Sequence, residues 1–275
     1  MYKTVLLVTL LVLSTTSYSQ GLTENKMQEI INSYKSNIET ATVIKDCGHV
    51  LDGPLFIAKQ FENRLLDASL NFSSKERKVV AQNIYKDMLR TNKVIENHTT
   101  KNNVLTIIHK ITSQLTSKNV TYKLTIFDSE QINAFTTMGG YIYITTGLLN
   151  FVDSYDELAF ILGHEIAHEF KLHTQRKVTK LLFSSNIFNL IRLTDFQKMA
   201  ASINSTLSAP FDQIDEYEAD QHGAILAKKA GYDSNRFGDF FKKLEKYEKR
   251  DLLTKLKSTH PFAMHRKNCI ANYTN

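Results

Sequence analysis

The chain has 275 residues, of which 42% are hydrophobic, and a formal net charge of +6. This length suits one large domain or two small ones, and the composition suits an ordinary globular core. The basic residues are scattered along the chain in short runs, and no nucleic-acid-binding motif accompanies them. We therefore interpret them as solvated surface charges and expect no nucleic-acid partner.

Residues 1–19 have the pattern of a secretory signal peptide. Lys3 precedes an apolar run over 5–13, and Ser17 and Ser19 occupy the −3 and −1 positions of a cleavage site. The run is too short to span a bilayer. We expect an exported protein, periplasmic in a Gram-negative host and otherwise secreted, with no transmembrane segment in the mature chain. Export permits a disulfide, and the two cysteines, Cys47 and Cys269, are predicted either to pair or to remain buried thiols.

Residues 20–99 are predicted to form an N-terminal helical region. Apolar residues recur at helical spacing over 22–46 and 55–70, and a third helix begins near Ser73. The polar stretch from Asn92 to Asn103 breaks this pattern and is the best candidate boundary. We expect the region to pack as a helical appendage on the domain that follows.

Residues 100–275 mix helices with two short strands. A helix is predicted over 104–115, and alternating patterns predict strands over 122–127 and 141–145. Further helices are expected over 158–172, 212–230 and 237–257. The apolar segment 181–193 is far shorter than a membrane span, and it remains open whether it is a lid, a membrane-surface contact or core. The pattern indicates an α+β domain that is mainly helical.

The helix predicted over 158–172 contains Gly163-His164-Glu165-Ile166-Ala167-His168, an H-E-x-x-H motif. Residues four apart lie on one face of a helix, so His164 and His168 can bind one ion, with Glu165 beside the open coordination position. A glutamate placed there can take a proton from metal-bound water. Ser154 and Glu157 supply a capping box at the start of the helix.

A third protein ligand is needed, and the metzincin pattern fails because Lys171 and Thr174 occupy its Gly and His positions. The alternative is a carboxylate from the helix over 212–230. Glu216 and Asp220 share a face of that helix, so one can bind zinc while the other supports a ligand histidine.

Four sequence fragments in one order resemble the HtpX-like and CAAX-prenyl-protease-type zinc metalloendopeptidases. The resemblance covers about 100–275 and places the chain near the soluble, exported, BepA-like branch. The fragments are the H-E-x-x-H motif, Glu216-Tyr217-Glu218-Ala219-Asp220, Asn133-Ala134-Phe135 with Gly139 to Leu149, and Thr259-His260-Pro261 with Arg266. The resemblance implies a zincin-like metallopeptidase domain with a small β-sheet whose edge strand flanks the active-site helix.

The resemblance also implies roles for single residues. His164, His168 and Glu216 would bind one Zn²⁺ per chain, with Glu165 as the base. Asp220 would orient a ligand histidine. His260 and Arg266 would stabilise the oxyanion or control access to the metal. The residues implied to bind substrate are Asn133, Ala134, Gly140 and Tyr141. An extended polypeptide is expected to add a strand beside residues 141–145.

These implications predict a zinc metalloendopeptidase that degrades unfolded or misassembled proteins of the cell envelope. Its expected partners are polypeptide substrates and envelope or outer-membrane proteins. The alternative is an exported chaperone or assembly factor that binds extended segments with little proteolysis. Glu165 distinguishes the two functions, because only hydrolysis requires it.

Overall fold

The computed structural model describes residues 59–60, 63–64, 66–67, 74–117, 120–184, 213–248 and 263–273. The predicted signal peptide, most of the first two predicted helices, Cys47, His260 and most of segment 181–193 lie outside these residues. The elements are, in chain order, α4 (Ser74–Thr91), α5 (Lys101–Thr112), β1 (Lys123–Phe127), β2 (Ala134–Thr137), β3 (Tyr141–Thr145), α6 (Thr146–Phe151), α7 (Tyr155–Phe170), α8 (His173–Ser184), α11 (Gln213–Lys229), α12 (Asp239–Glu248) and α13 (Ala263–Ile270). Two short 3₁₀ turns, Ser234–Arg236 and Ala271–Tyr273, complete them. The predicted fold class is confirmed: a mainly helical α+β domain with a small sheet.

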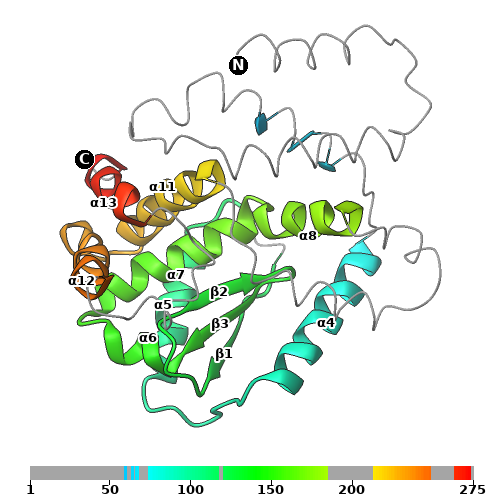
Figure 1. Cartoon of the computed structure of the whole chain (residues 1–275), viewed down its shortest axis with the longest axis horizontal. Coiled ribbons are helices and arrows are strands. Elements are labelled where there is room, and N and C mark those ends of the chain that lie inside the picture. The colour runs from blue at the N-terminus through cyan, green and yellow to red at the C-terminus, as the bar shows by residue number, and fades with distance from the viewer. Residues whose placement is uncertain are drawn as a thin grey trace, which may run out of the picture.

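The sheet has three strands in the order β1-β3-β2 (Figure 1). β3 pairs in parallel with β1 and antiparallel with β2, with Lys123 opposite Tyr141 and Ala134 opposite Ile144. The expectation that a substrate strand adds beside residues 141–145 is therefore wrong, because β3 is bonded on both sides. The edge strand next to α7 is β2. The sequence pattern did not separate β2 from the turn before β3.

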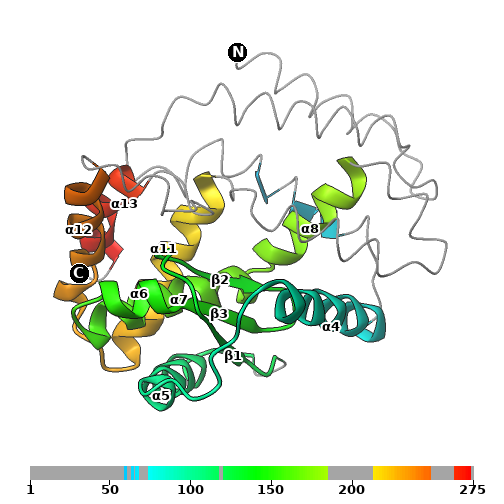
Figure 2. The same ribbon diagram turned by 60° about the horizontal axis from the view of Figure 1, so that its bottom comes forward.

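Both faces of the sheet are covered, which explains why all five residues of β3 are buried. Ile142 and Ile144 belong to the core formed with α5 and α7. Tyr141 and Tyr143 belong to a second core formed with α4, where Tyr141 stacks on Tyr85 with ring centroids 4.4 Å apart. The alternation predicted from the sequence is present, but it separates two apolar surfaces rather than an apolar and a solvated one. Figure 2 shows α4 and α5 at separate places beside the sheet.

The helix α4 is part of this packing, although it lies before the predicted domain boundary. Its residues Val80, Ala81 and Ile84 pack against the tyrosine face of β3. After α4, the chain pairs with β1, since the N–H of Ile95 donates to the carbonyl of Ile126 at 2.9 Å. The boundary near residue 99 remains a prediction.

The helices α7 and α11 cross at two glycines. A Cβ atom on Gly163 would lie 2.6 Å from the carbonyl oxygen of Gly223, and one on Gly223 would lie 2.5 Å from the amide nitrogen of His164. Glycine is therefore required at both positions for the backbones to meet. This contact brings α11 directly alongside the H-E-x-x-H motif (Figure 1).

The C-terminal helix α13 packs on α11, where Cys269 lies beside Tyr217. Cys269 is disulfide-bonded, and the sequence has one other cysteine, Cys47. Among the helices in the described part of the chain, none combines the length and apolar character needed to cross a membrane.

Candidate active site

The helix α7 begins at a cap close to the predicted one. The Ser154 hydroxyl accepts a hydrogen bond from the N–H of Glu157 at 3.2 Å, as in a capping box. The Glu157 carboxylate turns to the N–H of Asp153 rather than to that of Ser154, and it also accepts from Lys243 Nζ at 2.7 Å. The cap and this ion pair fix the start of the helix that carries His164 and His168.

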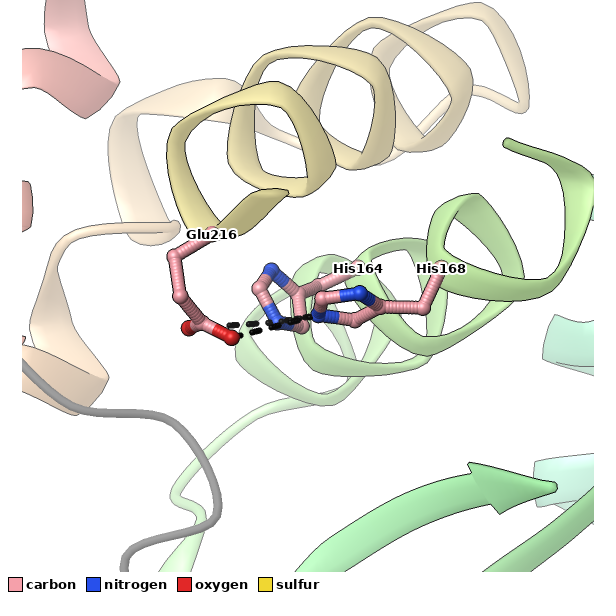
Figure 3. Close-up of side chains that lie close together, drawn as sticks. All are labelled: His164, His168 and Glu216. Carbon is pink, nitrogen blue, oxygen red and sulfur yellow. Dashed lines mark hydrogen bonds and ion pairs between the residues drawn. The ribbon is translucent and has the colours of Figure 1, made fainter. Parts of the chain in front are cut away.

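His164, His168 and Glu216 converge on one point between α7 and α11 (Figure 3). One ligand atom from each lies within 4.8 Å of the others. The Nε2 atoms of the two histidines are 2.9 Å apart, and Glu216 oxygens lie 3.8 Å from His164 Nε2 and 3.4 Å from His168 Nε2. All three side chains are buried. Two imidazoles and one carboxylate form a donor set used by zinc.

The outward nitrogens of both histidines have partners of their own. His164 Nδ1 lies 2.9 Å from Asp220 Oδ1, and His168 Nδ1 lies 3.0 Å from His173 Nδ1. If each ring carries its single proton on Nδ1, each of the facing Nε2 atoms presents a lone pair beside the Glu216 carboxylate. Burial and the neighbouring His164 hold the pKa of His168 well below its ordinary value. A neutral imidazole with a bare Nε2 is the form that binds a metal, so these residues fit a divalent cation.

Arg266 ties the carboxylates of α11 together. Its guanidinium donates to both oxygens of Asp220, at 2.6 Å each, and to Glu216. Burial raises the pKa of Asp220, but the charge and hydrogen bonds of Arg266 outweigh it and hold that pKa below its usual value. Arg266 was expected near the cleft as an oxyanion or access group. It is 3% exposed and held by the carboxylates that face the histidines, and its predicted role in catalysis or access stays a prediction.

His173 belongs to the site, although the sequence motifs do not include it. α7 ends at Phe170, and Leu172, with φ of 62°, turns the chain so that α8 starts at His173. Besides its contact with His168, His173 Nε2 lies 3.1 Å from Glu218 Oε2. Glu218 also pairs with Lys171 at 3.0 Å. The signal available in the sequence was a histidine just past the motif helix, opposite a helix rich in carboxylates.

Two more basic residues lie near these carboxylates. Burial lowers the pKa of Lys177 in α8 to about 8, while the charges of Glu216, Glu165 and Asp215 oppose this shift. His222 is half-buried, and burial lowers its pKa to about 4. The site thus holds two further nitrogen bases that sequence patterns did not assign.

The predicted substrate residues lie at opposite ends of the β2–β3 hairpin. Asn133 directly precedes β2 and Ala134 starts it, whereas Gly140 and Tyr141 lie at the turn and the start of β3. The Tyr141 side chain packs toward α4 and not toward α7. At the turn, the N–H of Gly139 donates to the carboxylate of Glu169 at 2.8 Å, which ties the hairpin to the end of the motif helix.

The comparison with known families decides the assignment. The model of peptidase family M48 matches residues 98–274. The chain belongs to peptidase family M48. The resemblance inferred from the four sequence fragments is thereby confirmed, and so is the prediction of a metallopeptidase.

Several curated proteins are similar to this M48 domain. The mitochondrial metalloendopeptidase OMA1 of Arabidopsis thaliana is 32% identical over 168 residues, which are 59% of this chain and 33% of that protein. The beta-barrel assembly-enhancing protease of Yersinia pestis is 26% identical over 152 residues, 50% of this chain and 31% of that protein. The human mitochondrial metalloendopeptidase OMA1 is 30% identical over 139 residues, 46% of this chain and 26% of that protein. The chain spans about a third of these relatives or less.

Proposed function

We propose that this M48 domain is a zinc-dependent endopeptidase that hydrolyses peptide bonds of unfolded or misassembled proteins in the cell envelope. The observation that carries the proposal is the convergence of His164, His168 and Glu216 on one point, with Glu165 on the same helix. Both histidines present Nε2 to that point while their Nδ1 atoms are engaged elsewhere. This is the state of a histidine that serves as a metal ligand.

Zinc held by these three residues supplies a Lewis acid that lowers the pKa of water toward about 7 and polarises a peptide carbonyl. Glu165 directly follows His164 and is 2% exposed. In the proposed mechanism, its carboxylate accepts the proton of the attacking water and later delivers that proton to the leaving amine. Asp220 and Arg266 hold His164 and Glu216 in place while this transfer occurs.

We infer that an extended substrate pairs with main-chain groups at the outer edge of β2. The N–H of Thr145 donates to the carbonyl of Asn133, and bonded pairs alternate along an antiparallel ladder. The next hydrogen-bonded pairs in this register are Phe135 with Tyr143 and Thr137 with Tyr141. The N–H and C=O groups of Ala134 and Thr136 therefore point away from β3. A substrate that pairs with these groups must be extended, which favours unfolded polypeptides.

The proposed location rests on two features besides the N-terminal pattern of residues 1–19. A disulfide at Cys269 fits an oxidising compartment outside the cytosol. Among the similar proteins, one is named for enhancing beta-barrel assembly. A mature N-terminus at residue 20, measured by mass spectrometry of the protein isolated from its host, tests the export step.

The catalytic proposal is tested with two glutamates of α7 that each follow a histidine facing the site. Glu165→Gln is compared with Glu169→Gln, because Glu169 faces the turn at Gly139 instead. We expect both variants to bind one zinc per chain. Cleavage of casein falls by about 10²–10⁴-fold in Glu165→Gln, the usual contribution of a general base, and Glu169→Gln retains most of it.

Other outcomes separate the alternatives. Zinc in the wild-type chain without cleavage, together with suppressed aggregation of an unfolded substrate, supports the chaperone function instead. Equal loss of cleavage in both glutamate variants contradicts the role of Glu165 as the base. A wild-type chain that binds no zinc contradicts the metal site.

A further inference from the structure

The two histidines that face Glu216 are supported by unlike groups. His164 Nδ1 meets the carboxylate of Asp220 at 2.9 Å, whereas His168 Nδ1 meets another imidazole, that of His173, at 3.0 Å. A carboxylate, a backbone carbonyl or water is the common partner for the outward nitrogen of a metal-binding histidine. An imidazole can take this place only in one of its two neutral tautomers.

The hydrogen-bond partners determine which tautomer His173 adopts. When His168 binds a cation through the Nε2 that faces His164 and Glu216, its proton is on Nδ1 and is donated to His173 Nδ1. His173 Nδ1 must then be an acceptor, which leaves the proton of His173 on Nε2. That nitrogen lies 3.1 Å from Glu218 Oε2, an acceptor. The hydrogen bonds therefore run in one direction, from His168 through His173 to Glu218.

The surroundings keep this chain of hydrogen bonds in one arrangement. His168 and His173 are both 0% exposed, so water does not compete for their nitrogens. Lys171 pairs with the other Glu218 oxygen at 3.0 Å. The chain of hydrogen bonds thus ends on a carboxylate that a lysine holds in place. Asp215 Oδ1, at 3.7 Å from His173 Nε2, is too far to replace it.

We propose that His173 is a positioning residue for the metal site, which holds His168 with Nε2 toward the ion, and that Glu218 selects the tautomer of His173 that can do so. This inference rests on the proposed zinc site. It also makes the two nitrogen ligands unequal. His164 is polarised by an anion, and His168 by a neutral ring, so His168 is the weaker donor.

The test compares two substitutions of His173 with different acceptors. His173→Asn keeps an acceptor, since Oδ1 of asparagine is bonded to Cγ as Nδ1 of histidine is. His173→Leu fills a similar volume without one. Zinc affinity is measured for the purified chain by competition with a chromophoric chelator. We expect His173→Leu to weaken zinc binding by about 10–100-fold and His173→Asn to restore most of that loss.

Two substitutions of Glu218 give an independent test that does not depend on the folding of the His173 variants. Glu218→Gln keeps an oxygen that accepts from His173 Nε2, and Glu218→Leu does not. The inference predicts weaker zinc binding in Glu218→Leu than in Glu218→Gln. In the cobalt-substituted chain, the visible absorption bands shift in the leucine variants, because the orientation of His168 changes.

The possible results separate this inference from the proposed function. Wild-type zinc affinity in both leucine variants overturns the inference and leaves the zinc site standing. Equal losses in His173→Leu and His173→Asn, with unchanged cobalt bands, overturn it as well, because they show a packing effect alone. Absence of zinc binding in the wild-type chain overturns the proposed function and the inference together.

Discussion

The crossing of α7 and α11 at two glycines makes a sharp prediction for Gly223→Ala. The new Cβ would lie 2.5 Å from the amide nitrogen of His164 and 2.7 Å from the carbonyl carbon of Gly163. Both are backbone atoms, which cannot rotate away as a side chain can. The two helices must therefore move apart.

The size of that movement follows from the same distances. Ordinary van der Waals contact begins at 3.4 Å, so α11 must withdraw by about 0.9 Å at this point. Metal–ligand distances tolerate about 0.2 Å. Since Glu216 and Asp220 are on the helix that moves, we expect zinc affinity to fall by at least about tenfold. Overpacking costs about 1–3 kcal/mol, and the better helix propensity of alanine returns about 1 kcal/mol, so the net loss of stability is at most about 2 kcal/mol.

Gly238→Ala is the matched control, because no atom of a residue that the structure describes, apart from the chain neighbours, lies within 4 Å of a Cβ placed there. Both variants are compared with the wild-type chain by urea unfolding without metal and by zinc competition. We expect Gly238→Ala to change neither property appreciably. Zinc affinity of Gly223→Ala equal to that of the control would refute the reasoning, since it would show that the helix crossing does not set the ligand distances.

Two further predictions concern charges near the site. Burial raises the pKa of Glu169 from its ordinary 4.5 to about 7, so the wild-type chain loses stability as the pH rises through this range. The glutamine in Glu169→Gln cannot ionise. Its free energy of unfolding should therefore rise by up to about 3 kcal/mol relative to that of the wild-type chain between pH 4 and pH 8, measured by urea unfolding without metal. Parallel curves of stability against pH would contradict the burial argument. Arg266→Met removes a cation from the buried carboxylates Glu216 and Asp220, which costs the metal-free protein about 3–5 kcal/mol. Added zinc should restore part of that loss in a thermal unfolding assay, and a metal-free variant as stable as the wild-type chain would contradict this assignment.

Much of the fold could be predicted from the sequence, because its signals are local. The strand predicted over 122–127 is β1 (Lys123–Phe127), and the helix predicted over 212–230 is α11 (Gln213–Lys229). The central position of β3 could not be predicted in the same way. β2 has only four residues, and strand order depends on contacts between distant segments rather than on alternation within one.

The candidate site shows the same limit. Helical spacing placed His164 and His168 on one face, and the acidic face of α11 offered Glu216 and Asp220. On a continuous helix, however, residues five apart differ by about 140° around the axis, which directs His173 away from His168. The left-handed conformation of Leu172 removes that separation, and a leucine carries no signal for it. The groups that Arg266 contacts could not be predicted either, because they depend on where α13 packs.

The contact between α7 and α11 is uneven along its length. Near Glu216 the helices meet through the imidazoles of His164 and His168 and a carboxylate, and near Gly223 they meet through bare backbone. The first kind of contact depends on the charge of these groups, and the second does not. The crossing at Gly223 therefore sets how far apart the two helices lie, whether or not an ion is bound.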